Sequence, residues 1–597
     1  MRPNLDTHGG WAAAFLTLFL TASYIAVAAD LSGLRSFWSP DCGARFAMIR
    51  SQIEHGRLIY VYYSAADLDP TGQINPLAYF LFHRSHDFCV MYQPLFPFLS
   101  GLAYRAFGFH GLTIIPVLCG LGTSLVAYRT ASRLELRLCL LVPLLLGLAT
   151  PLLLYSVVFW DHSAQMLLAA LAGYWMLRSA QDASLRSAIA AGTVLGLGVW
   201  VHEMFLALFA ATWLGALPCL KGRRRIPCGL LMGFVPLVVL WGGFNLWIYG
   251  TPVGPHLGTN VFQNTADHPF SLALVLDQSQ LAERAMSQLV GTQIADARDD
   301  TFPYYLAFFC LLLFYVHVVW SRGPLNRIAP CLCLAAAALA LFLLLQGRGA
   351  TGGLFLATPL LVPALAVPWY VRLTPFPAPP PETFYAWASR TCWLFALFLL
   401  INPITPGTDW GSRYLLTALP LLSLLSAHAL EQQYEHMGGR WRGVAVASAV
   451  GVVGLSLLCQ ISGLLWVRRC LVFNQALNAQ IQAVSAPAVV TDIYIDGLAP
   501  DAPSSQVRFL VRTDDDASLL ARILRQRRYR EVAFVGGDLG ADQVEAALNH
   551  AGLPFVRQGG QPLWKVNHAL QEGEELQYVR FDLKPGGEAK IVCVPPK

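Results

Sequence analysis

Charge is scarce in this sequence. Only 13% of its 597 residues are Asp, Glu, Lys or Arg, whereas 55% are hydrophobic. A soluble globular domain carries about 25% charged residues, so this composition excludes an ordinary water-soluble protein. Apolar runs of about 20 residues, long enough to cross a bilayer, recur along the chain. The sequence therefore predicts an α-helical polytopic membrane protein.

Signatures of zinc, nucleotide and nucleic-acid sites are missing as well. The 13 cysteines include no CxxC pair and no Cys/His spacing of a zinc site. Most of them lie inside apolar runs, where we expect small core residues. The net charge of +5 comes from basic residues scattered between apolar runs, which argues against a nucleic-acid partner. The stretch VGGDLG near the C-terminus is too weak for a nucleotide-binding loop, since a turn explains its glycines.

About thirteen segments are long and apolar enough to be transmembrane helices, and none contains Asp, Glu, Lys or Arg. Arginine and lysine gather in alternate connections, which puts the N-terminus in the cytoplasm by the positive-inside rule. The C-terminus then lies outside, and we expect an integral multi-pass protein of a bacterial inner or plasma membrane. The predicted spans are approximately 11–29, 112–128, 138–159, 163–177, 187–201, 204–220, 226–248, 303–320, 328–347, 349–371, 391–408, 414–430 and 443–467.

Three parts of the chain face outward in this topology. They are a structured first loop at about 30–111, a second loop at about 249–302, and the tail. The tail alternates short apolar strands with amphipathic helices, which predicts a small soluble α/β domain over 468–597 beside a transmembrane domain over 1–467. Its predicted elements are strands at 488–495 and 531–537 and helices at 516–529 and 541–552.

Residues 92–108 of the first loop are apolar but interrupted by prolines and Arg105. A membrane span here would place the later arginine clusters outside. We therefore expect a helix that lies along the membrane surface.

Charged side chains gather at the outward ends of the predicted spans. Each one alone is typical of a solvated cap or a snorkelling anchor; the WDHS stretch, for example, also fits an ordinary helix N-cap. Several acids and two arginines on one side of the membrane, however, indicate a site. The residues concerned are Asp41, Asp161, His162, His202, Glu203, Arg348 and Arg413.

The order of these groups resembles the C-type superfamily of membrane glycosyltransferases, which includes protein O-mannosyltransferases and lipid A aminoarabinose transferases. The resemblance covers about residues 11–467. Protein O-mannosyltransferases carry Asp-Glu in the first loop, whereas Asp41 is followed by Cys42 here, which weakens a protein-mannosylating assignment. The matching segments are WSPDCGARF, QPLFPFLSGLAYRAFG, FWDHS, YGTPVGP and WGSRYLL.

The resemblance implies an enzyme that moves a sugar from a polyprenyl-phosphate-linked donor to an acceptor hydroxyl at the extracytoplasmic face. The acceptor is a lipid, a glycan or a protein. Asp41 is then expected to be the general base of a single inverting displacement. Arg413, with Arg348 as the second choice, is expected to bind the donor phosphate, because a planar guanidinium suits phosphate oxygens.

Some relatives use a divalent ion near the donor phosphate, so a Mg, Mn or Zn ion is left open as a cofactor. Asp161, His162, His202 and Glu203 carry side chains of metal-ligand type, and they are also candidates for contacts with the substrate. Their spacing in the sequence does not by itself indicate a metal site.

Two cysteines, Cys42 and Cys89, share the first outward loop. In an oxidising compartment such a pair can form a disulfide. This disulfide would brace the segment that carries Asp41.

Other functional classes stay open. An oligosaccharide ligase or polymerase would use a lipid-diphosphate donor and the same outward arginines. A polytopic transporter usually has charged residues within the membrane, and the predicted spans contain no Asp, Glu, Lys or Arg. A non-enzymatic assembly subunit would use the tail as a partner module.

Overall fold

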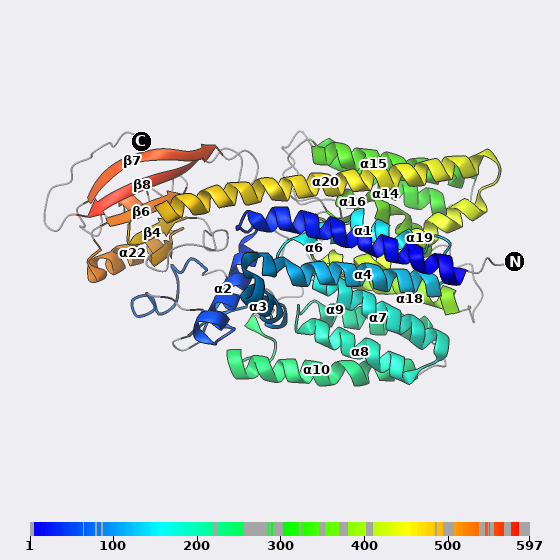
Figure 1. Cartoon of the computed structure of the whole chain (residues 1–597), viewed down its shortest axis with the longest axis horizontal. Helices are drawn as coiled ribbons and strands as arrows, with labels where there is room; N and C mark the ends of the chain where they lie inside the picture. The colour runs from blue at the N-terminus through cyan, green and yellow to red at the C-terminus, as the bar shows by residue number, and fades with distance from the viewer. Residues whose placement is uncertain are drawn as a thin grey trace. The chain divides into compact units, whose positions relative to one another are not determined.

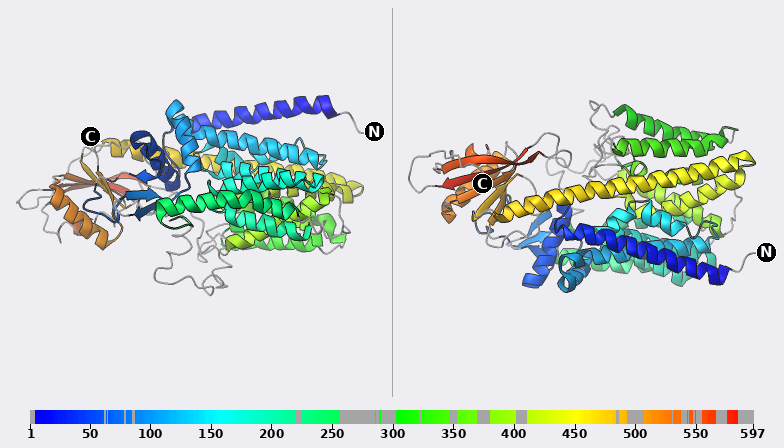
Figure 2. Two further views of the ribbon diagram at one scale, coloured as in Figure 1. Left: turned by 90° about the horizontal axis from the view of Figure 1, so that it is seen from below. Right: turned by 45° about the horizontal axis from the view of Figure 1, so that its top comes forward.

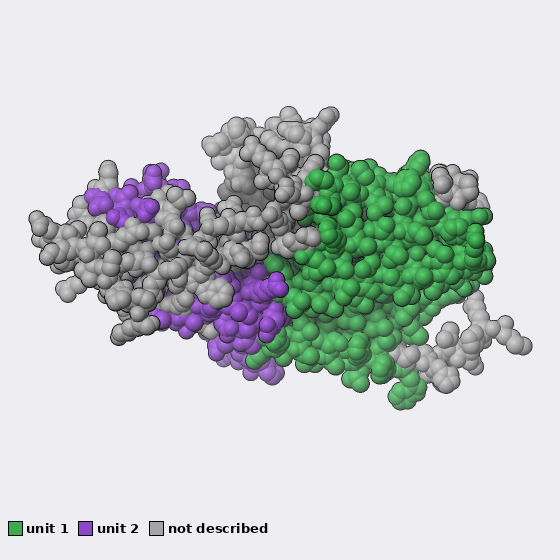
Figure 3. Space-filling view, turned by 90° about the horizontal axis from the view of Figure 1, so that it is seen from above, with its two compact units in different colours: residues 1–30, 110–466 green, residues 31–109, 467–597 purple. Residues whose placement is uncertain are grey.

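The computed structural model divides the chain into two compact units, shown in Figure 3. Unit 1 comprises residues 1–30 and 110–466, and unit 2 comprises residues 31–109 and 467–597. The structure describes residues 5–61, 63, 65–77, 80–84, 87–219, 225–255, 285, 288–289, 302–320, 324–345, 353–368, 380–400, 410–483, 486–492, 507–529, 531–536, 542, 544–546, 549, 555–565 and 575–583.

Unit 1 is a bundle of apolar helices that lie roughly along one common axis (Figures 1 and 2). Helices α1 and α20 each begin in unit 1 and end in unit 2. The helices are α1 (Leu5–Gly33), α4 (Ile114–Arg133), α5 (Val142–Leu148), α6 (Leu152–Val157), α7 (His162–Asp182), α8 (Leu185–Val199), α9 (Phe205–Cys219), α10 (Arg225–Tyr249), α14 (Phe302–Trp320), α15 (Ala329–Leu345), α16 (Leu354–Ala357), α18 (Pro380–Leu400), α19 (Leu419–His436) and α20 (Arg440–Ala483), with short 3-10 helices η5 (Pro324–Ile328), η6 (Pro359–Ala366) and η7 (Leu415–Ala418).

Seven helical stretches among the described residues are long and apolar enough to cross a membrane. This agrees with a multi-pass membrane protein, while the finer count of thirteen stays a prediction. Two predicted spans are not single helices. Residues 138–159 form two helices, α5 and α6, with Pro151 just before α6. Residues 349–371 contain α16 and the 3-10 helix η6, which includes Pro363. Proline lacks the amide hydrogen that an unbroken helix needs.

The predicted surface helix is present as α3 (Leu95–Phe107) in unit 2. Gly108, which follows it, has φ 60° and ψ −146°, a conformation that only glycine adopts easily, and it ends the helix. One face of α3 is buried, whereas Phe98, Leu102 and Phe107 are exposed. This amphipathic pattern is the one expected of a helix at a membrane surface, and its contact with lipid stays a prediction.

Before α3, the first loop forms a helix and a small sheet. Helix α2 (Pro40–His55) precedes a three-stranded antiparallel sheet of order β1-β3-β2. Its strands are β1 (Tyr60–Val61), β2 (Leu81–Arg84) and β3 (Asp87–Val90).

A fully buried carboxylate, Asp69, shapes the turn after β1. It accepts hydrogen bonds from the Tyr63 hydroxyl (3.0 Å) and from the backbone N–H groups of Gln73 (2.9 Å) and Ile74 (3.0 Å). Burial, reinforced by the Asp69 carboxylate, raises the pKa of Tyr63 above its ordinary value. The phenol therefore keeps its proton and stays a donor to Asp69.

The tail contains a five-stranded mixed sheet of order β5-β4-β6-β8-β7, in which β4 is parallel to β5 and β6. Strands β4 and β6 fall within the two strands predicted from the sequence, and α22 (Asp514–Arg527) overlaps the first predicted helix. A capping box between Thr513 and Asp516 fixes the start of α22. Most of the second predicted helix, 541–552, lies outside the described residues. The strands are β4 (Ala488–Thr491), β5 (Val507–Leu510), β6 (Glu531–Gly536), β7 (Phe555–Lys565) and β8 (Glu575–Leu583).

Helices cover both faces of the central strand β4. Successive residues of a strand point to opposite sides of the sheet. In β4, Ala488 and Val490 pack against α22, whereas Val489 packs against Leu477 and Ile481 at the end of α20. Strand β4 thus has α22 on one face and the end of α20 on the other.

The first loop packs into the same core as the tail. Tyr63, Ile74 and Phe88 are buried in one cluster with Phe509 and Phe534. The backbone N–H of Leu510 also donates to the Ile74 carbonyl (2.8 Å), and the Gln73 amide donates to Asp516 (2.8 Å). The two units divide the chain between residues 466 and 467, and the predicted domain limits of 1–467 and 468–597 stay a prediction. The first loop, however, groups with the tail and not with the helical bundle.

Candidate active site

Asp41 lies in the first turn of α2, where the helix dipole favours a negative charge. Its Oδ1 accepts a short hydrogen bond from the Tyr92 hydroxyl, and its Oδ2 accepts one from Ser39 Oγ (3.0 Å). Ser39 is also the N-cap residue, and its Oγ accepts from the Asp41 backbone N–H (3.4 Å). Two hydroxyl donors therefore fix the orientation of this carboxylate.

A buried arginine completes the surroundings of Asp41. The guanidinium of Arg45 lies 3.9 Å from the centre of the Tyr92 ring and donates to the Asp41 backbone carbonyl (3.1 Å). Arg45 is 3% exposed and Tyr92 6% exposed. A cation stacked on a phenol ring holds that ring in place, so Arg45 fixes the donor that orients Asp41.

The aromatic residues around Asp41 are packed inside unit 2. The Phe37 ring lies 5.3 Å from Phe46 and 5.5 Å from Phe109, and Phe37, Trp38 and Phe46 are all buried. The end of α20 holds the same segment, because the Asn474 side chain donates to the Phe37 carbonyl (2.6 Å). These residues serve as local structure for Asp41 and not as an exposed aromatic belt.

In unit 1, the FWDHS segment places Asp161 and His162 at the start of α7, 2% and 1% exposed. Asp161 occupies the N-cap position, yet its side chain makes no capping hydrogen bond. The His162 ring stacks on Trp160 (5.2 Å between centroids) and meets the Tyr155 ring edge-on (4.8 Å). An ordinary N-cap role therefore does not account for Asp161.

Tyr155 joins this segment to the one that carries Arg413. Its hydroxyl accepts from the Trp410 backbone N–H (3.2 Å) and donates to the Trp410 carbonyl (3.1 Å). The Trp410 indole in turn donates to the Gln460 side chain on α20 (3.3 Å). Gly411 and Ser412 then take positive φ values of 82° and 52°. Tyr155 thus supplies both backbone hydrogen bonds that Trp410 would make in a regular helix or strand.

A second hydrogen bond sets the register of α7 against η7. Thr417 Oγ1 donates to Gln165 Oε1 (2.9 Å). Asp161 is four residues before Gln165, and Arg413 is four residues before Thr417. Four residues along α7 span about 6 Å, and Arg413 lies in the turn that leads into η7.

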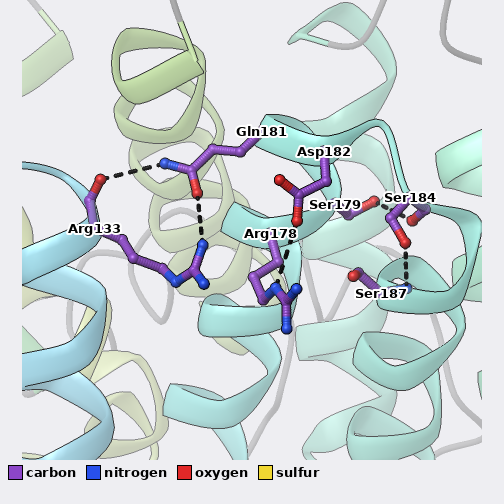
Figure 4. Close-up of polar contacts among 7 residues, drawn as sticks. All are labelled: Arg133, Arg178, Ser179, Gln181, Asp182, Ser184 and Ser187. Carbon is purple, nitrogen blue, oxygen red and sulfur yellow. Dashed lines mark hydrogen bonds and ion pairs between the residues drawn. The ribbon is translucent and has the colours of Figure 1, made fainter.

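The far ends of these two segments also lie together. Near the end of α7, Gln181 and Arg133 exchange hydrogen bonds of 3.4 and 3.2 Å (Figure 4). Near the end of α19, Glu435 pairs with Arg137 (3.0 Å) and Glu431 accepts from the Leu138 backbone N–H (2.7 Å). Both α7 and α19 therefore end beside the 133–138 segment, so they run parallel. The segments that carry Asp161 and Arg413 lie side by side at the opposite end.

Arg413 follows the strained turn at Ser412. Its guanidinium donates to the Tyr414 hydroxyl (3.2 Å) and lies 5.0 Å from the centre of the Tyr414 ring. The side chain is half-buried. The predicted meeting of Arg413 with Asp41 concerns residues of different units, and it stays a prediction.

His202 and Glu203 are 7% exposed in the connection between α8 and α9. His202 Nδ1 accepts from the Met204 backbone N–H (3.3 Å) and lies 4.0 Å from Glu203 Oε2. Among the residues that the structure describes, no three His, Cys, Asp or Glu side chains gather as a metal site requires. The four candidate ligands thus do not form a ligand set in this structure.

The remaining predicted features are a disulfide between Cys42 and Cys89, the cation Arg348 and the second loop. In the described part of the first loop, no disulfide joins Cys42 to Cys89, and both are buried thiols, one on α2 and one on β3. The core packing of α2 against the small sheet takes the place of that brace. Arg348 and most of the predicted second loop, 249–302, lie outside the described residues.

Gln165, Thr417, Tyr155 and Gln460 were not predicted from the sequence. Polar residues inside apolar runs are the only sequence signal that they offer, and this signal does not identify their partners.

No family model and no curated protein matches this sequence. Among solved structures, the chain is similar to ArnT from Cupriavidus metallidurans in the apo state. The identity is 13% and the TM-score 0.45, over 96% of this chain and 98% of that chain. The same enzyme bound to undecaprenyl phosphate gives 13% identity and a TM-score of 0.44 over the same shares. A likeness at this level shows neither the family nor the function of this chain.

Proposed function

We propose that this chain is a membrane glycosyltransferase that moves a sugar from a polyprenyl-phosphate-linked donor to an acceptor hydroxyl at the extracytoplasmic face. The observation that carries the proposal is the oriented carboxylate of Asp41, in a segment whose sequence resembles the C-type membrane glycosyltransferases. The segments that carry Asp161 and Arg413 lie next to each other, which gives the proposal further support.

Asp41 acts as the general base. Each carboxylate oxygen has two lone pairs, so a carboxylate can accept more hydrogen bonds than the two from Tyr92 and Ser39. The acceptor hydroxyl gives its proton to Asp41 as its oxygen attacks the anomeric carbon of the donor. The bond from that carbon to the lipid phosphate breaks, which inverts the configuration. Such a base contributes about 10²–10⁴-fold to the rate.

Arg413 binds the departing lipid phosphate. The phosphate gains negative charge as the glycosidic bond breaks, and a guanidinium stabilises that charge through two parallel hydrogen bonds. The double hydrogen bond from Tyr155 to Trp410 holds the chain three residues before Arg413, so the cation need not be ordered during the reaction. Arg348 remains the second candidate for this role.

The proposed steps assign roles to residues of the chain alone, and a divalent metal ion stays open as a cofactor. Loss of transfer on exhaustive chelation, restored by Mg, Mn or Zn, would add a metal to this scheme. The sugar and the acceptor class are not specified by these residues.

The test is transfer by the purified full-length chain in lipid nanodiscs, from undecaprenyl-phosphate-linked glucose, galactose, mannose and arabinose. We expect Asp41→Asn to lower turnover by about 10²-fold or more while leaving donor binding in place. The matched control is Glu54→Gln, which removes an exposed carboxylate from the other end of α2 and should keep full activity.

Three outcomes contradict the proposal. An Asp41→Asn variant with most of its turnover removes Asp41 as the base. A wild-type chain that transfers only oligosaccharides from lipid-diphosphate donors belongs to the ligase or polymerase class. Energised solute uptake into vesicles without sugar transfer would favour a transporter.

A further inference from the structure

Gln165 has a buried amide that its protein contacts satisfy only in part. The residue is 0% exposed, and its Oε1 accepts from Thr417. Its Nε2 has no hydrogen-bond partner among the described residues. A buried donor without a partner costs about 1–3 kcal/mol, so packing of α7 against η7 explains the oxygen of this amide but not its nitrogen.

Gln165 lies on the same face of α7 as Asp161. The two residues are four apart, and the Gln165 backbone N–H donates to the Asp161 carbonyl (3.0 Å). Side chains at this spacing are neighbours, with about 5–6 Å between their Cβ atoms. The face they share meets η7, because the Gln165 partner Thr417 is on that element.

Ser412, next to Arg413 in the sequence, adds a buried hydroxyl to the buried amide of Gln165. It is 3% exposed, and its Oγ likewise has no hydrogen-bond partner among the described residues. Ser412 holds a φ of 52°, which is strained for a residue with a side chain. Its backbone carbonyl is used by Leu415 (2.9 Å), so its position in the turn is fixed and its hydroxyl remains available to a ligand.

The chemistry of these groups suits a neutral sugar ring. A carboxylate accepts from hydroxyl groups, an amide NH2 donates to hydroxyl oxygens, and a serine hydroxyl does both. Together with a carboxylate acceptor, two neutral groups recognise a polyhydroxylated ligand, whereas a phosphate would demand mainly donors. Arg413, which follows Ser412 directly, supplies the donors for phosphate.

We propose that Gln165 and Asp161, with Ser412, form the subsite that recognises the hydroxyl groups of the donor sugar. This inference rests on the proposed function and names the part of the site that sets sugar specificity. Gln165 donates to one ring hydroxyl, and Asp161 accepts from the same or the adjacent one. A donor that lacks this hydroxyl leaves buried polar groups unpaired, which is the strongest basis that a site has for rejecting an analogue.

The first test uses the wild-type chain alone. Whichever undecaprenyl-phosphate-linked sugar it transfers is compared with the monodeoxy analogues of that sugar, by kcat/KM. We expect one deoxy position to lower kcat/KM by about 10²-fold or more. If every monodeoxy analogue is transferred as well as the parent sugar, the subsite is overturned.

The second test assigns that preference to Gln165. Gln165→Glu keeps the oxygen that Thr417 uses and removes the NH2 group, and Gln165→Met removes both in a side chain of similar length. In each variant we expect the parent sugar to lose its advantage over the sensitive deoxy analogue by at least about tenfold. Two variants are used so that the result does not depend on one of them folding.

The matched control is Gln433→Glu. Gln433 is another buried glutamine, 4% exposed, whose Nε2 donates to Tyr315 on α14 (3.0 Å). This variant should keep the full preference for the parent sugar. Undiminished discrimination in both Gln165 variants overturns the inference while leaving the proposed function intact. A wild-type chain that transfers none of the monophosphate donors overturns the proposed function, and the subsite with it.

Discussion

The two ends of the hairpin formed by α7 and α8 differ in how deeply their charged groups are buried. At the Arg178 end, where α7 stops and α8 starts, the charged side chains are partly exposed and have polar partners (Figure 4). Arg178 Nε lies 3.5 Å from Asp182 Oδ2, and these side chains are 36% and 45% exposed. At the Asp161 end, Asp161 and His162 are almost completely buried.

The two ends therefore differ in what their charges cost. An exposed ion pair contributes about 0.2–1 kcal/mol and needs no further explanation. A buried carboxylate carries a desolvation penalty of several kcal/mol that only good partners offset. The Arg178 end can be explained by helix termination and solubility. The Asp161 end buries a carboxylate that makes no capping hydrogen bond, so termination of α7 does not explain it, and its burial fits the proposed site.

The largest contrast is expected between two arginines. Arg413→Ala removes the proposed phosphate ligand at the Asp161 end and should lower kcat by about 10²–10³-fold, the usual effect of deleting one charge-stabilising donor. Arg178→Ala removes a cation of the same kind from the other end and should leave kcat unchanged. Steady-state transfer from the accepted undecaprenyl-phosphate sugar measures both.

Equal losses of kcat in these two variants would end the functional distinction between the hairpin ends. Arg413→Lys sharpens the result, because lysine keeps the charge but loses the fork of donors. We expect an intermediate activity from it.

The next largest effect is expected at Tyr155. Tyr155→Phe removes both hydrogen bonds to the Trp410 backbone and leaves a buried N–H and C=O unpaired, which should cost about 1–3 kcal/mol of unfolding free energy. Since Arg413 is then less well placed, kcat should fall by about tenfold or more. Thermal unfolding in detergent and donor turnover measure the two effects.

Tyr174→Phe is the control for this change, because Tyr174 lies on α7 towards the Arg178 end, with its ring 5.7 Å from the Arg133 guanidinium. It should lose neither stability nor kcat to a comparable degree. A Tyr155→Phe variant that is destabilised but keeps its kcat would show that the Trp410 hydrogen bonds are structural only.

Apolar runs were enough to predict most helices of unit 1. The predicted span 226–248 agrees with α10 to within one residue at each end, since a long run without charge has few other structures available. Helix α20 contains the predicted span 443–467 and continues beyond it to Ala483. Its last residues leave the apolar pattern and are held by tertiary contacts with the tail sheet.

The candidate site could be predicted only as residue types at span ends. The sequence placed Asp161 and Arg413 at the same end, but it contained no signal for the Gln165–Thr417 hydrogen bond, whose partners are 252 residues apart. It also predicted a separate tail, whereas Tyr63 and Ile74 of the first loop share the tail core. Local patterns predict elements, while contacts between distant segments depend on packing that no short window contains.

A smaller effect is expected from the cap at the Arg178 end. Ser184 is the N-cap of α8 and accepts from the Ser187 backbone N–H (3.3 Å; Figure 4). Ser184→Ala should therefore cost about 1 kcal/mol of unfolding free energy, and it should not change kcat because no proposed site residue contacts this turn. Thermal unfolding and turnover measured on one preparation separate the two. Ser184→Thr, which keeps a capping oxygen, should restore most of the lost stability.

The smallest effect is expected from the ion pair between Arg178 and Asp182. Both side chains are more than a third exposed, so solvent and salt screen their attraction. Arg178→Ala should change the unfolding free energy by no more than about 0.5 kcal/mol, and the difference should shrink as the ionic strength rises. Thermal unfolding at low and high salt measures it. A larger loss that persists at high salt would mean that the Arg178 end also depends on a desolvated charge, and the contrast between the two ends of the hairpin would no longer locate the active site.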